Sequence, residues 1–325
     1  MAVYTQVSFD EASLLLQRLQ LGQLQSMEGC SGGIENTNYF VTTDSGAYVL
    51  TLFERLSAQQ LPFYLRLMKH LAVSGIPVPE PAADANGALQ YVVNGRPATV
   101  VNRLRGKSEL SPTPAHCASV GAWLAKMHQV GQQFDVQQPN LRGLGWWNDT
   151  VPVILPFLDL AQQNLIQAEL AYQNHVAASS VYAALPRGAI HADLFRDNVM
   201  FASGMSCTPG QGDALEMTGF FDFYFAGVDT WVFDLGVCLN DWCVDLATGA
   251  PEPERTQAFL TAYESIRRLD TAERKALPAM MRAAALRFWI SRLWDLHLPR
   301  EASMLTAHDP THFERVLRQR LKFAG

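Results

Sequence analysis

One short segment constrains this chain more than any other. Positions 191–198 read His-Ala-Asp-Leu-Phe-Arg-Asp-Asn, so Asp193 follows a histidine by two positions and precedes an asparagine by five. An apolar run at 187–190 comes directly before this segment, and a second acid, Asp222, lies further along among phenylalanines. We therefore predict a polar loop that follows one buried strand and faces the end of another.

Asp193, Asn198 and Asp222 are the residue types that phosphoryl transfer from ATP requires. The reaction needs one carboxylate to orient and deprotonate a hydroxyl, and an amide oxygen and a second carboxylate to hold Mg²⁺. We predict that Asp193 is the catalytic base and that Asn198 and Asp222 bind the metal. A carboxylate among phenylalanines is costly to bury alone, and a cation offsets that cost. The competing interpretations are a helix cap at Asp193, a turn residue at Asn198 and a hydrogen-bonded structural aspartate at Asp222, and they do not explain why the three occur together.

The composition excludes several classes of protein. A chain of 325 residues with 48% hydrophobic and 17% charged residues is expected to be globular, with room for two cores. A net charge of −6 without a run of basic residues argues against a nucleic acid or an anionic membrane as partner, and nothing indicates a protein partner. No apolar run is long enough to span a bilayer, and no signal peptide is recognisable. Five cysteines without paired spacing favour reduced thiols and a cytoplasmic location.

The first hundred residues have the pattern of an antiparallel sheet with helices. We predict helices at Ser8–Leu21 and Leu61–Val73 from their apolar periodicity. Turn sequences such as Asp44-Ser-Gly46 separate the predicted strands. These strands are Leu24–Gly29, Asn38–Thr43, Ala47–Phe53, Leu89–Val93 and Ala98–Val101.

Helices dominate from residue 113 onward. They are predicted at His116–Val130, Ile154–Val176, Glu254–Leu269 and Leu277–Asp295, with a small non-helical island at 190–230 that contains the motif. The predicted class is α+β, with two lobes. A small antiparallel-sheet N-lobe (1–102) would bind nucleotide, and a larger, mainly helical C-lobe (103–325) would carry the catalytic loop and the substrate site.

A segment rich in glycine and amide side chains lies between the first two strands. Such residues let backbone N–H groups approach phosphates, although a Gly-Gly pair is often only a turn. The predicted nucleotide contacts are Ser31, Gly32, Gly33, Asn36, Thr37 and Asn38, together with Thr51 on the third strand.

These motifs resemble the aminoglycoside-phosphotransferase-like family of small-molecule kinases, which have a bilobal protein-kinase-like fold. More narrowly, the chain is similar to the homoserine kinases of that family. The segments that carry the narrower resemblance are 33–41, 48–54, 191–198, 240–243 and 287–294. The resemblance implies phosphorylation of the L-homoserine hydroxyl with ATP and Mg²⁺. The alternatives are another kinase of the same fold, acting on choline, hydroxylysine or an aminoglycoside, and a non-catalytic nucleotide-binding pseudokinase.

The resemblance also implies roles for residues around the motif. His191 would brace the loop, and Asp234 would hydrogen-bond it from below. Thr51 stands where a protein kinase has the lysine that contacts the phosphates, and the helix 61–73 lacks the glutamate that pairs with such a lysine. The phosphate charge is then left to loop amides, Mg²⁺ or an arginine such as Arg55, and the sequence does not choose among them.

An amino-acid substrate needs an acid for its ammonium group and a forked donor for its carboxylate. The candidates are Asp241, Arg292, Arg287 and Arg142. We pair Asp241 with the ammonium and Arg292 with the carboxylate. The competing interpretation of each arginine is a solvated helix face or a structural ion pair.

Overall fold

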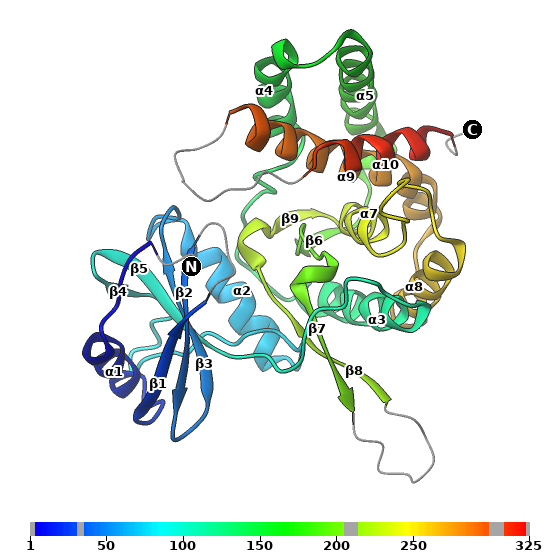
Figure 1. Cartoon of the computed structure of the whole chain (residues 1–325). Helices are drawn as coiled ribbons and strands as arrows, with labels where there is room; N and C mark the ends of the chain where they lie inside the picture. Colours follow the sequence, from blue (N-terminus) through cyan, green and yellow to red (C-terminus); the bar gives the residue numbers. More distant parts are fainter. Residues whose placement is uncertain (1–3, 31–35, 205–213, 299–308, 323–325) are drawn as a thin grey trace. The chain divides into compact units, whose positions relative to one another are not determined.

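The computed structural model describes residues 4–30, 36–204, 214–298 and 309–322 (Figure 1). The chain divides into two compact units. The first comprises Met1–Arg105 with Gly219–Phe221, and the second comprises Gly106–Thr218 with Asp222–Gly325. The first contains an antiparallel sheet and the second is mainly helical, which confirms the predicted α+β class. Among the described residues, no helix is both long and apolar enough to cross a membrane.

The sheet of the first unit has five antiparallel strands in the order β1-β2-β3-β5-β4. They are β1 (Leu24–Gly29), β2 (Asn36–Thr43), β3 (Ala47–Phe53), β4 (Tyr91–Val93) and β5 (Arg96–Asn102). The predicted strands are confirmed, with small shifts at their ends. Asn94 and Gly95 join β4 to β5, both at positive φ (50° and 74°), as the tightest hairpin turns require.

Two helices of the first unit follow from local sequence signals. α1 (Phe9–Arg18) begins at a capping box in which Ser8 and Glu11 bond to each other's backbone. It ends earlier than predicted because the chain turns at Gln20, whose φ is 57°. α2 (Leu61–Val73) has its predicted bounds.

The core of the first unit lies between α1 and one face of the sheet. Leu15 and Leu16 of α1 pack in the same buried cluster as Leu50 and Leu52 of β3. Because side chains alternate across a strand, Thr51 lies on the opposite face from these leucines. The face that carries Thr51 is therefore the one available for a polar site.

The second unit contains α3 (Pro114–Gly131), α4 (Leu144–Ile154), α5 (Leu160–Ala177), α6 (Ser180–Ala183), α7 (Trp231–Asp241), α8 (Pro253–Ile266), α9 (Thr271–His297) and α10 (Thr311–Lys322). The prediction of one helix from Ile154 to Val176 was wrong at its start. α4 ends at Ile154, and Asp159 then caps α5 in a capping box with Gln162. α7 escaped prediction because it is buried on all sides and has no polar face to give it a period.

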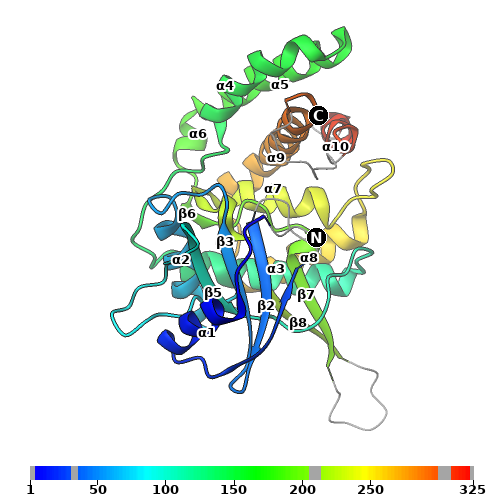
Figure 2. The same ribbon diagram turned by 60° about the vertical axis from the view of Figure 1, so that its left-hand side comes forward.

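Close helix contacts organise the second unit. α3 packs against α8 and α7 packs against α9, and Figures 1 and 2 show α9 beside α10. A side chain at Gly121 of α3 would meet the carbonyl oxygen of Phe259 at 2.4 Å, and one at Gly236 of α7 would meet that of Met280 at 2.7 Å. Glycine at these two positions therefore permits the approach of both helix pairs.

Short strands surround the motif. β6 (Arg187–Ile190) pairs antiparallel with β9 (Gly227–Thr230), and β7 (Val199–Gly204) pairs with β8 (Ala214–Phe220). The loop 191–198 leads from β6 to β7. The non-helical island predicted around the motif is thus present, but α7 begins at Trp231, directly after β9.

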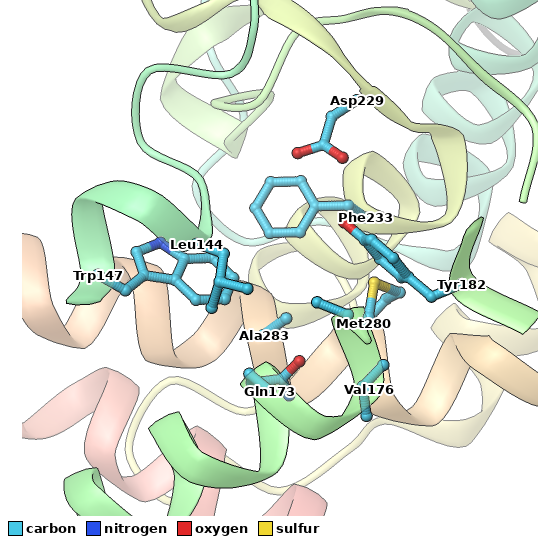
Figure 3. A pocket seen from close by; sticks show the side chains of 10 residues that line it. Leu144, Trp147, Gln173, Val176, Tyr182, Asp229, Phe233, Met280 and Ala283 are labelled. Carbon is cyan, nitrogen blue, oxygen red and sulfur yellow. The ribbon is translucent and has the colours of Figure 1, made fainter. Parts of the chain in front are cut away.

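A small cavity lies among α4, α5, α7 and α9 (Figure 3). Its volume is about 20 Å³, which suits a single water molecule and not an amino-acid substrate. Asp229 at its edge already accepts hydrogen bonds from Asn140 at 3.0 Å and Arg187 at 3.1 Å. The cavity is a packing defect of the helical core, and the functional site lies elsewhere.

Candidate active site

Asp234 of α7 holds the start of the loop 191–198. Its carboxylate accepts hydrogen bonds from the backbone N–H groups of His191 and Ala192, each at 2.8 Å. Ala192 has φ 63°, a left-handed conformation that costs a residue with a Cβ about 1–2 kcal/mol. Hydrogen bonds to an ionised acceptor are strong enough to offset this cost. The strained backbone at the motif is therefore stabilised by a side chain from a distant helix.

His128 of α3 in turn orients Asp234. Its Nε2 lies 3.1 Å from Oδ2 of Asp234, its Nδ1 lies 2.8 Å from the hydroxyl of Tyr263, and its ring is fully buried. Burial lowers the pKa of His128 in spite of the neighbouring carboxylate, so the ring is neutral at neutral pH. Burial alone would raise the pKa of Asp234, but the hydrogen bond from His128 and those from the loop make the net shift downward. Sequence reasoning missed His128 because 106 positions separate it from Asp234.

His191 lies beneath the loop with its ring fully buried. Its Nδ1 accepts a hydrogen bond from the backbone N–H of Asp193 at 3.3 Å. Its ring also packs against that of Phe223, with centroids 4.5 Å apart. The side chain therefore contacts the backbone of the loop, in keeping with a supporting position.

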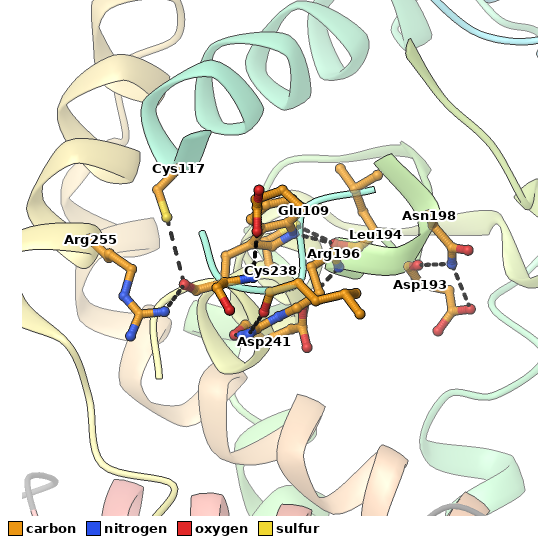
Figure 4. A network of polar contacts seen from close by, with 12 residues as sticks. Glu109, Cys117, Asp193, Leu194, Arg196, Asn198, Cys238, Asp241 and Arg255 are labelled. Carbon is orange, nitrogen blue, oxygen red and sulfur yellow. Dashed lines mark hydrogen bonds and ion pairs between the residues drawn. The ribbon is translucent and has the colours of Figure 1, made fainter. Parts of the chain in front are cut away.

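Asn198 faces Asp193 across the loop (Figure 4). Its Nδ2 donates to the backbone carbonyl of Asp193 at 2.9 Å and lies 3.4 Å from the carboxylate Oδ2. Because the amide nitrogen is held there, the amide oxygen points away from Asp193. No described residue donates a hydrogen bond to that oxygen, so it is suited to bind a cation.

Asp222, like Asp197, adds negative charge close to Asp193. It adopts a left-handed conformation, with φ 69° and ψ 60°. Burial raises the pKa of Asp193 well above its ordinary value; Arg287 opposes that shift, and the carboxylates of Asp222 and Asp197 add to it. A carboxylate with a raised pKa beside other carboxylates is the setting in which a divalent cation is stabilising.

The donor set fits Mg²⁺ bound together with a nucleotide. No cluster of three or more His, Cys, Asp or Glu side chains suited to a metal occurs in the described part of the chain. Mg²⁺ at phosphoryl-transfer sites takes one or two carboxylates and completes its octahedron with phosphates and water. The carboxylate of Asp222 and the amide oxygen of Asn198 satisfy that smaller requirement.

The predicted nucleotide residues on β2 and β3 lie on two different faces of the sheet. Thr51 donates a hydrogen bond to Oδ1 of Asn38 at 2.7 Å, its neighbour across β2 and β3. Thr37 needs a correction, because it lies on the other face of β2. Its buried hydroxyl donates to Glu54 at 2.7 Å and accepts from the backbone of Tyr4 at 2.9 Å, so the side chain serves the sheet and not a phosphate. Asn36 begins β2 on the same face as Asn38, and Ser31, Gly32 and Gly33 lie outside the described residues.

We expect the change Thr51→Lys to leave kcat/KM unchanged or lower. The substitution breaks the hydrogen bond to Asn38, and α2 offers buried Phe63, Tyr64 and Leu67 but no acid to pair with an ammonium group. An unpaired ammonium in such surroundings loses solvation or its proton. Steady-state kinetics with varied ATP measure the effect, and Thr51→Val controls for the lost hydroxyl. A large gain in kcat/KM would show that Thr51 is a defective remnant of the usual lysine.

Asp241 also needs a correction (Figure 4). It is 7% exposed, and its Oδ2 accepts hydrogen bonds from the backbone N–H of Arg196 at 2.8 Å and from Nε of the same residue at 3.2 Å. Arg196 also donates to the backbone carbonyls of Asp241 and Leu110. The charge of Asp241 is thus already balanced, and the pair ties the loop 191–198 to the end of α7. Asp241 is not a free anion for a substrate ammonium group.

The three predicted arginines occupy different surroundings. Arg292 donates to the carbonyl of Asp309 at 3.0 Å, and its guanidinium lies 4.4 Å from the ring of Phe313. The guanidinium carbons of Arg142 and Arg287 lie 6.0 and 4.9 Å from the ring of Phe225. Arg142 and Arg287 therefore share the ring of Phe225, and the charges of both Arg287 and Arg292 interact with that of Asp193.

Comparisons with known proteins agree with this chemistry. Residues 26–277 match the model of the phosphotransferase enzyme family. A homoserine kinase of Polaromonas naphthalenivorans (strain CJ2) is 63% identical over 321 residues, covering 99% of this chain and 98% of that protein. A homoserine kinase of Paraburkholderia xenovorans (strain LB400) is 52% identical over 321 residues, covering 99% of this chain and 96% of that protein.

Solved structures share the fold. An amicoumacin kinase in complex with AMP-PNP and Ca²⁺ superposes with a TM-score of 0.67 at 18% identity, covering 97% of this chain and 93% of the other. A spectinomycin phosphotransferase in complex with ADP gives a TM-score of 0.56 at 13% identity, covering 98% of each chain. At these identities the likeness concerns the fold alone. The family match and the two full-length relatives show that the chain belongs to the phosphotransferase enzyme family, in which its curated relatives are homoserine kinases.

Proposed function

We propose that this protein phosphorylates the side-chain hydroxyl of L-homoserine with ATP, yielding O-phospho-L-homoserine and ADP, a step of threonine biosynthesis. The observation that carries the proposal is the loop 191–198, where a half-buried Asp193 faces Asn198 beside Asp222. The full-length similarity to homoserine kinases at 51–63% identity supports the choice of acceptor. We also propose a cytoplasmic location, which suits the free thiols of Cys117, Cys238 and Cys243.

Asp193 acts on the acceptor hydroxyl. Its carboxylate accepts a hydrogen bond from the hydroxyl, orients the oxygen toward the γ-phosphate of ATP, and takes the proton as the new P–O bond forms and the bond from the γ-phosphorus to the departing ADP oxygen breaks. Burial raises its pKa and makes it a stronger base than an exposed aspartate. Asn198 and Asp234 keep the loop in place, the former through the carbonyl of Asp193 and the latter through the backbone of His191.

Asn198 and Asp222 would hold Mg²⁺ by their side-chain oxygens. When bound, the ion supplies positive charge that neutralises the phosphates of ATP. Asp222 follows the end of β8 in an αL backbone conformation. Asn198 donates a hydrogen bond through Nδ2 to the carbonyl of Asp193, which leaves its Oδ1 available for the metal. Asn36, Asn38 and Thr51 remain candidates for nucleotide contact on one face of the sheet.

A substrate panel tests the proposal. ADP release is measured with ATP and Mg²⁺ against L-homoserine, L-serine, L-threonine, choline, hydroxylysine and kanamycin. We expect kcat/KM for L-homoserine to exceed that for every other acceptor by at least about tenfold, the factor that one extra specific contact provides. Preference for choline, hydroxylysine or kanamycin would assign the chain to another kinase of the same fold. The absence of turnover with every acceptor would favour a pseudokinase.

A further inference from the structure

Arg287 of α9 is a buried cation without a hydrogen-bond partner among the described residues. It is 3% exposed, and its Nη2 is buried and unpaired. Its guanidinium carbon lies 3.8 Å from the ring of Phe288 and 4.9 Å from that of Phe225. Aromatic rings stabilise a guanidinium only in part, and they accept no strong hydrogen bond from its N–H groups. A buried charged donor left unpaired costs free energy, so its presence asks for an explanation.

Other buried arginines of the same unit have partners. Arg282 is 8% exposed and donates to Oε2 of Glu169 at 2.6 Å. Arg320 is equally buried and donates to the side chain of Asn240 at 2.9 Å. Arg196 pairs with Asp241, as described above. This unit therefore supplies partners for buried guanidinium groups as a rule, and Arg287 departs from that rule beside the catalytic loop.

Charges of both signs lie around Arg287, and two of them are guanidinium groups. Burial lowers the pKa of Arg287 to about 10; Asp193 and Asp295 oppose this shift, and Arg142 and Arg292 add to it. Arg142 shares the ring of Phe225 with Arg287. Two guanidinium groups at one ring repel each other, and an anion placed between them would remove that repulsion.

We propose that Arg287 is the carboxylate-binding residue of the acceptor site and determines the preference for an amino-acid substrate. Its planar fork matches the two oxygens of an α-carboxylate, and Arg142, which also lies near the ring of Phe225, adds positive charge. The ring of Phe225 is an apolar surface for the methylene groups between the carboxylate and the reacting hydroxyl. The inference rests on the proposed function for the identity of the substrate.

A phosphate group of the nucleotide is a second anion with the same chemistry. We commit to the substrate carboxylate because Arg287 is the one buried arginine of this unit, among the described residues, that has no hydrogen-bond partner. The phosphates, in contrast, have the cation held by Asn198 and Asp222. The two sources predict different kinetics and can be separated.

The test compares two acceptors in wild-type enzyme and in Arg287→Met. L-Homoserine carries the carboxylate, and 3-aminopropan-1-ol has the same hydroxyl and amine without it. We expect Arg287→Met to raise KM for homoserine about 10- to 150-fold, the loss that a hydrogen-bonded charge pair represents. KM for ATP and kcat/KM for 3-aminopropan-1-ol should change by less than roughly threefold. If turnover of 3-aminopropan-1-ol is slow, its inhibition constant against homoserine is measured in place of kcat/KM. Arg287→Lys should recover part of the homoserine affinity, because it restores the charge without the fork.

A stability measurement separates binding from a structural role. Methionine at position 287 removes an unpaired buried charge, so we expect the Tm of Arg287→Met to equal or exceed that of the wild type. Arg282→Met should lower the Tm, because it leaves Glu169 buried without its partner. L-Homoserine alone should raise the Tm of the wild type but not that of Arg287→Met. Arg318→Gln, at an exposed position on α10, is the matched control for loss of an arginine and should leave both KM values unchanged.

Three outcomes would overturn the inference. Equal losses with both acceptors would mean that Arg287 does not contact the carboxylate. A rise in KM for ATP would assign it to a phosphate group. A Tm as low as that of Arg282→Met would make it structural. Failure of the proposed function is distinct from all three, because it would appear in the wild type as absent or non-preferred turnover of homoserine.

Discussion

Replacing Asp193 with asparagine is expected to lower kcat by about 10²–10⁴-fold, the contribution typical of a positioned general base. The substitution keeps the shape of the side chain and removes the group that takes the proton. Asp193→Ala should lose a similar or larger factor. KM for ATP should change little, since the loop is held through backbone contacts to Asp234 and Asn198 that do not involve the Asp193 side chain. Steady-state kinetics with homoserine and a nucleotide-binding titration measure the two effects.

Asp197→Asn is the matched control for Asp193→Asn. Asp197 lies in the same loop, is exposed, and adds negative charge that raises the pKa of Asp193. Removing its charge lowers the Asp193 pKa and should move the acidic limb of kcat/KM to lower pH without abolishing turnover. If Asp193→Asn retained most of the wild-type kcat, Asp193 would not be the base.

Removing the carboxylate of Asp222 is the second change with a large expected effect. We expect Asp222→Asn to lower kcat by about 10²–10³-fold, because a formal charge facing the metal and phosphates is lost. Asparagine is the appropriate substitution here, since position 222 has φ 69° and asparagine tolerates this conformation better than alanine does. The change therefore tests charge and not backbone strain. Activity measured over a range of Mg²⁺ concentrations should require far more Mg²⁺ than the wild type.

Asn198→Ala provides the comparison for Asp222→Asn. It removes a neutral ligand, so its loss of activity should be smaller and partly reversed by added Mg²⁺. It also removes the hydrogen bond to the carbonyl of Asp193, so a part of the loss should persist at saturating Mg²⁺. If Asp222→Asn left both the rate and the Mg²⁺ dependence untouched, the metal site would lie elsewhere.

The sequence by itself determined the class of fold and predicted the chemistry of the loop. Asp193 and Asn198 face each other because they belong to one short loop, where five positions of sequence separation restrict how far apart the side chains can lie. Strand alternation and turn residues likewise predict β3, and helical periodicity predicts α2, from neighbouring positions alone. α7 was missed because an element buried on every side carries no periodic signal.

Only the tertiary structure decided which charges are already paired. Asp241 and Arg196 are 45 positions apart, and they meet because α7 ends beside the catalytic loop. His128 reaches Asp234 across 106 positions. Arg282 and Arg287 lie on one helix and look alike in sequence, yet Arg282 meets Glu169 of α5 and Arg287 meets aromatic rings. Partners of this kind depend on how distant helices pack, and a local pattern contains no record of that packing.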